Sequence, residues 1–174
     1  GSNTAPYDIW EKAATSIQTA IDAANTGDII IVGSSSTGHG DGTYTENVDV
    51  TKSLTIKSES GYEYTTVVAA SSDDHVFDIR ASNVTIGGKN NGFSIYGATD
   101  EFTAGICIEN DFKNCKIESN CCGWDADHKN NYGIYVYFSN DNVLTGNMAN
   151  FNNLGIYLQT SDNNEINNNI TNSN

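Results

Sequence analysis

The loop from Gly123 to Tyr132 holds the side chains best suited to binding a metal ion. It lengthens one repeat of the chain, and long loops on regular scaffolds carry function more often than the scaffold does. Asp125 and Asp127 offer the carboxylate oxygens that calcium prefers, with Asn side chains nearby. Lys129 stands where a further ligand would be expected, which weighs against the site. The sequence therefore indicates a calcium site at Asp125 and Asp127, with a solvated loop as the alternative.

Four aromatic residues, Trp124, Tyr135, Tyr137 and Tyr157, are the candidates for binding sugars. Their rings offer flat apolar faces, which suit the apolar faces of sugar rings. Trp124 belongs to the loop just described, and the tyrosines follow in two later segments. We predict that these four residues form a carbohydrate-binding surface. The alternative is that the tyrosines only stabilise a sheet through contacts between neighbouring strands.

The elements that position these residues repeat from His75 onward. Each unit has a short segment of alternating apolar residues, a polar turn and a second apolar segment. The last two units are offset by 22 residues, from Gly133 to Gly155, and the earlier units carry insertions. A period in the low twenties is typical of a solenoid whose coils each contain three short strands and three turns. The first segments of the units are Val76-Phe77-Asp78-Ile79, Gly105-Ile106-Cys107-Ile108, Gly133-Ile134-Tyr135-Val136 and Gly155-Ile156-Tyr157-Leu158.

Strand periodicity then assigns side chains to the inside or the outside of the coils, because successive side chains point to opposite faces. Successive coils stack at about 4.8 Å, so that like residues lie above like residues. The predicted fold is an all-β, right-handed, single-stranded parallel β-helix with a short capping α-helix at its N-terminal end. The predicted interior column contains Ile106, Ile108, Ile134, Val136, Ile156 and Leu158. The predicted outward positions are Asp78, Cys107, Tyr135 and Tyr157.

Asparagine recurs at one place in this register. Asn120, Asn147 and Asn169 each follow the end of a second segment by three residues. Stacked Asn amides can hydrogen-bond from coil to coil, as in other stacked β structures. The abundance of asparagine is therefore explained by the fold without any further function.

The four cysteines are too few for a disulfide scaffold in a chain of this length. Cys121 aligns with Met148 and Ile170 and is predicted to lie in the interior, while Cys115 is placed near a turn. Cys107 and Cys122 are predicted to face outward, and any disulfide pairing stays open. Zinc ligation by Cys121, Cys122 and His128 is disfavoured, because adjacent strand residues point to opposite faces.

Before the repeats, one short amphipathic helix is predicted over residues 16–25. Thr15 is its expected N-cap, with Gln18 completing a capping box, and Gly27 is its expected end. We therefore predict an N-terminal arm at 1–14 and a single β-helix domain at 15–174. That domain divides into an N-terminal cap at 15–70 and repeat coils at 75–174.

Four stretches carry a family resemblance: 16–24 (SIQTAIDAA), 27–32 (GDIIIV), 42–48 (GTYTENV) and 53–56 (SLTI). Together they resemble the N-terminal cap of the NosD-like family, whose repeat is also called the carbohydrate-binding and sugar-hydrolase domain. Residues 133–153 and 155–174 resemble its consensus coil. The resemblance covers about residues 15–174 and is specific for the fold. It implies an extracellular protein of the kind found in archaeal surface layers or among polysaccharide-active proteins.

Enzymes of this fold need clustered groups on one outer sheet, and the sequence does not offer them. Lyases of the pectate type use calcium-binding carboxylates and a basic residue, and hydrolases use paired acids. The chain has one arginine, Arg80, and its outward positions show no ladder of carboxylates. Gly38-His39-Gly40 resembles a hydrolase motif but precedes the repeats. We therefore expect no catalysis in this segment.

The charge of the chain limits its partners. The formal net charge is -14, with eight Lys and Arg, so phosphate backbones and anionic membranes are repelled. No stretch is apolar for long enough to span a bilayer. The expected partner is a polysaccharide or cell-surface glycan. Asn83-Val84-Thr85 and Asn169-Ile170-Thr171 fit the N-glycosylation pattern, though chance matches are common in so Asn-rich a chain.

The last coil reaches Asn174 without a recognisable cap. A solenoid needs covered ends, so we expect either a fragment of a longer protein or a chain that docks head to tail on another copy. The favoured function is an extracellular or cell-surface module that binds polysaccharide. The alternatives are a surface-layer or filament scaffold, and a fragment of a polysaccharide lyase or glycoside hydrolase.

Overall fold

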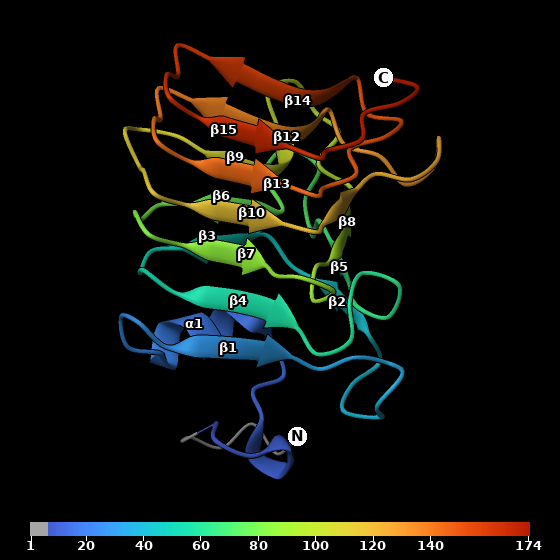
Figure 1. The fold of residues 1–174 in the computed structure, drawn as a ribbon. Coiled ribbons are helices and arrows are strands. Elements are labelled where there is room, and N and C mark those ends of the chain that lie inside the picture. The colour runs from blue at the N-terminus through green and yellow to red at the C-terminus, as the bar shows by residue number, and fades with distance from the viewer. Residues whose placement is uncertain (1–6) are drawn as a thin grey trace.

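The computed structural model describes residues 7–174 and has the expected architecture, a right-handed parallel β-helix. Its strands form three parallel sheets that run along the solenoid (Figure 1), with the two termini at opposite ends. Sheet A has the order β1-β4-β7-β10-β13-β15, sheet B the order β11-β8-β5-β2, and sheet C the order β14-β12-β9-β6-β3. Neighbouring strands of a sheet belong to successive coils, so the chain passes from sheet A to sheet B to sheet C in each coil as far as β12. In the last two coils, isolated bridges at Met148 and Ile170 take the place of sheet B strands.

The strands are short, as three-sided coils of about 22 residues require. Sheet A contains β1 (Ile29–Val32), β4 (Thr55–Ser58), β7 (Thr85–Gly87), β10 (Lys116–Glu118), β13 (Val143–Thr145) and β15 (Glu165–Asn167). Sheet B contains β2 (Thr43–Thr45), β5 (Thr66–Val68), β8 (Ser94–Tyr96) and β11 (Cys121–Cys122). Sheet C contains β3 (Val48–Val50), β6 (Phe77–Ile79), β9 (Ala104–Ile108), β12 (Tyr132–Tyr137) and β14 (Leu154–Gln159).

The interior column of sheet C has the predicted register. Ile106 pairs with Ile134, and Ile134 pairs with Ile156 on the next coil. Ile106 and Ile134 are fully buried, and Ile156 packs against the same core. β-Branched side chains suit this stacked, pleated interior, and each one fully buried contributes about 1.5–3 kcal/mol. The column therefore holds the coils together along the whole solenoid.

A row of amides fixes the turn that follows sheet A. The Asn120 backbone N–H donates to Asn147 Oδ1 at 3.0 Å, and the Asn147 N–H donates to Asn169 Oδ1 at 2.8 Å. The side-chain amides also contact one another, with Asn147 Nδ2 donating to Asn169 Oδ1 at 2.9 Å. We call these three residues the amide row. It supplies partners to turn backbone groups that would otherwise be buried without a hydrogen bond.

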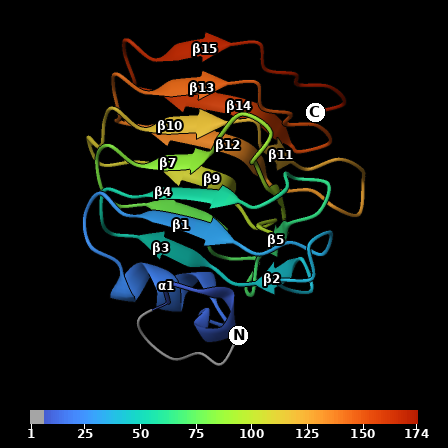
Figure 2. The same cartoon turned by 60° about the horizontal axis from the view of Figure 1, so that its bottom comes forward.

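The capping helix differs from the predicted one. α1 (Ile17–Ala23) follows a short 3₁₀ turn, η1 (Trp10–Lys12), and covers the N-terminal end of the solenoid (Figure 2). Its N-cap is Ser16, whose Oγ accepts from the Thr19 N–H at 3.1 Å, so the predicted Thr15 cap is wrong. Glu46 replaces the predicted capping box, because its carboxylate accepts from the Ile17 and Gln18 N–H groups at 2.8 and 3.0 Å.

The cysteines also need a correction. Cys122 pairs with Ile95 and lies in the core, whereas Cys121 pairs with Ser94 and Met148 outside the core cluster. The alignment of Cys121 with Met148 is right but its direction is reversed. Asn120 already points into the turn, so alternation brings Cys122 to the inside and Cys121 to the outside.

The other two cysteines are buried, as are Cys121 and Cys122, and all four are free. Cys115 lies before β10 and its backbone N–H donates to Asn142 Oδ1 at 2.9 Å, beside the turn as predicted. Cys107 is on the outer face of β9, but tyrosine side chains cover it. Within residues 7–174, no helix has the length and hydrophobicity to cross a membrane.

Candidate functional site

The outer face of sheet C carries one row of residues that changes character along the solenoid. The row contains Asp49, Asp78, Cys107, Tyr135 and Tyr157, contributed by β3, β6, β9, β12 and β14. Four of these residues are the predicted outward positions. Asp49 was missed, although Val48-Asp49-Val50 shows the same alternation as the later repeats and could have placed it outward. The face is therefore acidic at one end and aromatic at the other.

At the aromatic end, four tyrosines form a continuous cluster, which we call the tyrosine stripe (Tyr132, Tyr135, Tyr137 and Tyr157). The rings of Tyr135 and Tyr157 are parallel, 5° apart in angle, with centroids at 5.4 Å. Tyr132 and Tyr137 flank Tyr135 with centroids at 5.0 and 5.7 Å. The structure thus brings together all three tyrosines that the sequence singled out, and adds Tyr132.

Tyr135 is the centre of the stripe and is only 7% exposed. Its hydroxyl donates to Gln159 Oε1 at 2.9 Å, and burial raises its pKa to about 12. The phenol is therefore neutral at ordinary pH, with its orientation fixed. Tyr132, Tyr137 and Tyr157 are less buried and present ring surface to solvent.

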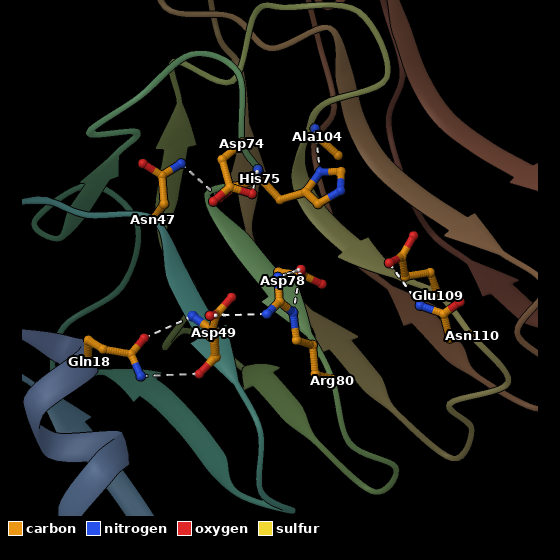
Figure 3. A network of polar contacts seen from close by, with 10 residues as sticks. All are labelled: Gln18, Asn47, Asp49, Asp74, His75, Asp78, Arg80, Ala104, Glu109 and Asn110. Carbon is orange, nitrogen blue, oxygen red and sulfur yellow. Dashed lines mark hydrogen bonds and ion pairs between the residues drawn. The ribbon is translucent and has the colours of Figure 1, made fainter.

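Beside the stripe lies a groove of about 400 Å³, lined by His75, Phe102, Glu109, Tyr135, Tyr137 and Gln159. Figure 3 shows His75 facing the backbone of Ala104 and Glu109 facing Asn110. The Ala104 N–H donates to His75 Nδ1 at 2.9 Å, so the neutral imidazole carries its proton on Nε2. Asn110 Nδ2 donates to Glu109 Oε1 at 2.8 Å. The groove thus combines hydrogen-bonding groups of fixed orientation with aromatic walls.

The acidic end of the row is held in an ion pair. Arg80 Nε donates to Asp78 Oδ2 at 2.7 Å, and Arg80 Nη1 donates to Asp49 Oδ2 at 3.2 Å (Figure 3). The Asp78 side chain is 5% exposed, and its Oδ1 has no hydrogen-bond partner among the described residues. Burial raises the pKa of Asp78, against the hydrogen bond from Arg80, which lowers it. This carboxylate is therefore shielded from solvent and engaged by the guanidinium.

Trp124 lies away from the tyrosine stripe. Its ring stacks on His128, with centroids at 4.6 Å, and meets the edge of Tyr96 at 4.9 Å. Tyr96 belongs to β8 of sheet B, whereas the stripe is on sheet C. The structure therefore separates Trp124 from the three tyrosines with which it was grouped.

The loop that was expected to bind calcium is closed by its own hydrogen bonds. Asp125 Oδ1 accepts from the backbone N–H groups of Asp127 and His128, each at 2.9 Å, and contacts His128 Nδ1 at 2.8 Å. The hydrogen bond from His128 is the main cause of a lowered pKa at Asp125. In the described part of the chain, no three or more His, Cys, Asp and Glu side chains gather in a group that could hold a metal ion. Calcium ligation by Asp125 and Asp127 stays a prediction.

The sequence-based prediction did not include several groove residues. The alternation of the strands could have identified two of them, Glu109 and Gln159. Glu109 and Gln159 each lie two residues after an outward position of the row, as does Tyr137. A period of two therefore predicts a second outward row at these positions. His75 had no such signal, because its role depends on a backbone N–H from the next coil.

The comparisons with known proteins agree with this architecture. The family model described as periplasmic copper-binding protein (NosD) matches residues 21–174. The chain belongs to the NosD family. A cell surface glycoprotein of the archaeon Methanothermus fervidus is 40% identical to this NosD-family chain over 111 residues, which is 63% of the chain and 16% of that protein. No solved structure matches the chain.

The family name mentions copper, so the side chains of this NosD-family chain that could ligate a metal bear on whether it can hold that ion. Copper sites use His, Cys and Met side chains. Here His39 stacks on Trp10, His75 accepts a backbone N–H in the groove, and His128 stacks on Trp124. Burial raises the pKa of all four thiols, which disfavours the thiolate that a metal would need. The donors within 7–174 do not fit a copper centre.

Proposed function

We propose that this chain is a cell-surface or extracellular β-helix module that binds a polysaccharide along sheet C without cleaving it. The surface location is supported by the names of its relatives, a cell surface glycoprotein and a periplasmic family. The chain matches a small part of that glycoprotein, so the module would serve as one part of a longer surface protein. Polysaccharide binding is supported by the geometry of the tyrosine stripe and the groove.

The observation that carries the proposal is a partly exposed cluster of tyrosine rings directly beside a groove lined by polar side chains. Tyr157 is stacked on Tyr135 and partly exposed, so it can contact the apolar face of a sugar ring. Glu109 and Gln159 line the groove and supply hydrogen-bonding groups for hydroxyls. Sites of this kind combine aromatic surface with a few placed polar groups that give orientation.

The charge of the site selects the class of glycan. Glu109 lines the groove, and the whole chain carries a net charge of -14. A polymer of uronic acids or sulfated sugars would place anions against this surface and would be repelled. An uncharged glycan has hydroxyls that donate to a carboxylate and no anions. We therefore propose a neutral polysaccharide as the ligand.

Binding without cleavage is favoured by the state of the two aspartates in the row. A glycosidase needs an acid that can reach the glycosidic oxygen and a second free carboxylate. Asp78 is 5% exposed and contacts Arg80, and Asp49 contacts the same arginine. Both aspartates are therefore engaged by Arg80 and are not free to act as acid and base, which supports a binding role for this face.

The test is binding of the full chain to a glycan array, followed by titration calorimetry with the best ligand. We expect Tyr157→Ala to weaken binding about tenfold, which corresponds to about 1.4 kcal/mol. Tyr64→Ala is the control, because Tyr64 is an exposed tyrosine that belongs to no part of the stripe or groove. Trp124→Ala tests whether the separate ring on the sheet B side takes part.

Three outcomes contradict the proposal. If the chain binds no neutral glycan, the proposed function is wrong. It is also wrong if the Tyr157 and Tyr64 variants lose affinity equally. A preference for uronic-acid polymers would overturn the ligand class.

Repeating the titration with calcium or with a chelator tests the predicted ion, since a calcium-dependent affinity that Asp125→Asn abolishes would show that the loop takes part.

A second candidate function is assembly through the ends of the solenoid. Leu154, Ile166 and Ile170 in the last coil are 44, 45 and 47% exposed, and β14 and β15 are edge strands. Such a surface fits a further coil of the same chain or a second copy docked head to tail. Light scattering across concentrations tests the second copy, and Ile166→Lys should abolish any association. A chain that stays monomeric at every concentration would exclude self-assembly.

A further inference from the structure

The two N-glycosylation patterns of the sequence fall in two different kinds of turn. Asn83-Val84-Thr85 lies at the corner between β6 and β7, and Asn169-Ile170-Thr171 follows β15. The sequence gives no reason to prefer one of them. The structure separates them by the direction and the hydrogen bonds of the two asparagine side chains.

Asn169 has its side chain fully engaged in the amide row. Its Oδ1 accepts from the Asn147 N–H at 2.8 Å and from Asn147 Nδ2 at 2.9 Å. Its Nδ2 donates to the Leu144 carbonyl at 2.8 Å. A glycan is attached through Nδ2, so a sugar at this position would displace the side chain from the row and leave Asn147 without two partners. The folded solenoid therefore disfavours a glycan at Asn169.

Asn83 is in the opposite situation. It is exposed, has φ of 60°, and its side chain makes no hydrogen bond to another described residue. Its backbone N–H donates to the Lys113 carbonyl at 2.9 Å, which fixes the turn independently of the side chain. Left-handed backbone at a corner suits Asn. Val84 next to it is fully buried, so the turn is anchored while the Asn83 side chain stays in solvent.

The same outward corner position recurs on later coils, so the environment of Asn83 is a property of the fold. Equivalent residues also have positive φ and are exposed, and each directly precedes a less exposed residue that leads into sheet A. These residues are Asn114, Asp141 and Asn163, with φ of 56°, 58° and 55°. A glycan attached to a side chain at this corner can therefore extend into solvent without disturbing the stacked coils.

We propose that Asn83 is an N-glycan acceptor of this protein and that Asn169 is not. Asn83 Nδ2 forms a bond to the anomeric carbon of a lipid-phosphate-linked oligosaccharide and loses one proton. The bond from that carbon to the phosphate oxygen breaks, and the lipid phosphate leaves with the electron pair. Thr85 at the second position after Asn83 completes the pattern that an oligosaccharyltransferase recognises. The inference needs the proposed surface location but is independent of glycan binding on sheet C.

The test is secretion of the full chain from a host that glycosylates Asn-X-Ser/Thr, followed by intact mass measurement and glycopeptide mapping of the folded protein. We expect one glycan, which Thr85→Val removes and Thr85→Ser keeps. Thr85→Val leaves Asn83 and its turn unchanged, so loss of the glycan does not depend on altered folding. Thr171→Val is the matched control at the second pattern and should leave the mass of the glycan unchanged.

A transplanted pattern tests whether the corner decides the outcome. Lys116→Thr creates an Asn-X-Thr pattern that begins at Asn114, the equivalent corner of the next coil, and should add a second glycan. An unmodified Asn83 in the secreted protein, or a glycan at Asn169 in the folded fraction, would overturn the proposal. Failure of glycan binding by the tyrosine stripe would leave these masses unchanged, so the two proposals fail separately.

Discussion

The turns at the two ends of the solenoid solve the same problem in different ways. In the C-terminal coils, amides of one residue type hydrogen-bond at successive levels, as in the row Asn120, Asn147 and Asn169. A second row follows sheet B, where the Asn130 N–H donates to Asn152 Oδ1 and the Asn152 N–H to Asn174 Oδ1, each at 2.9 Å.

In the N-terminal coils, each partner is a different residue. Asn91 Nδ2 donates to the carbonyls of Ser58 and Glu59, at 2.9 and 3.1 Å. Glu46 accepts from the first N–H groups of α1, and Lys52 Nζ donates to carbonyls at its other end, including Ile21 at 2.9 Å. The requirement is the same in both regions, because buried backbone groups need partners. Stacked identical amides provide these partners in the C-terminal coils, whereas the charged side chains of Glu46 and Lys52 provide them where the first coil meets α1.

The largest expected effect tests the repeated region. Asn147→Ala removes a fully buried amide that accepts from the Asn120 N–H and donates to the Ile117 carbonyl at 2.9 Å. Leaving buried groups unpaired costs about 1–3 kcal/mol each, so we expect the free energy of unfolding to fall by about 3 kcal/mol in urea titrations. Asn167→Ala, an exposed asparagine on β15, should change it by less than about 0.5 kcal/mol. Equal effects would show that the amide row does not stabilise the coils.

A smaller effect tests the cap. Glu46→Ala removes the acceptor for two N–H groups at the start of α1 and a negative charge near the positive end of the helix. Losses of this kind cost about 1 kcal/mol, and urea unfolding followed by circular dichroism measures them. Glu63→Ala removes an exposed glutamate and serves as the control. Unchanged stability in Glu46→Ala would mean that Ser16 alone caps the helix.

The smallest expected effect concerns pH and the acidic end of sheet C. Burial raises the pKa of Asp78 in the folded state, so the folded protein holds this proton more tightly than the unfolded chain. Stability from this group therefore falls as the pH rises from the unfolded value of about 4 through the raised folded value. The melting temperature, measured as a function of pH, should therefore fall less steeply over this range in Asp78→Asn than in the unmodified protein. Asp49→Asn, at the half-exposed partner of the same arginine, should keep the slope of the unmodified protein.

The solenoid was predictable because its signal is repeated. Ile106, Ile134 and Ile156 share one register, so an uncertain strand assignment in one coil is resolved by the equivalent residues of the next coil. The N-cap of α1 was predicted one residue early, at Thr15, although Ser16 caps the helix through the nearby Thr19 N–H. The capping box was predicted wrongly because its place is taken by Glu46, which lies 29 residues from Ile17. The direction of Cys121 and Cys122 was reversed because one inward Asn120 shifts the alternation of a strand that contains two residues.

The candidate site divides in the same way. The outward positions of Tyr135 and Tyr157 follow from local alternation, which is a property of any strand. The grouping of these rings with His75, Glu109 and Gln159, and the exclusion of Trp124, depend on which turn of the chain faces which sheet.

The sequence by itself determined the period, the apolar column and the rows of like residues, because each is encoded within one coil and then repeated. Only the tertiary structure decided which carboxylate is held by Arg80, which ring belongs to the stripe, and which of two glycosylation patterns has a free amide. Those outcomes depend on how side chains of successive coils are placed against one another, as in the pairs Asp49–Arg80, Tyr135–Tyr157 and Asn147–Asn169. Contacts between residues of different coils leave no mark in any single stretch of the chain.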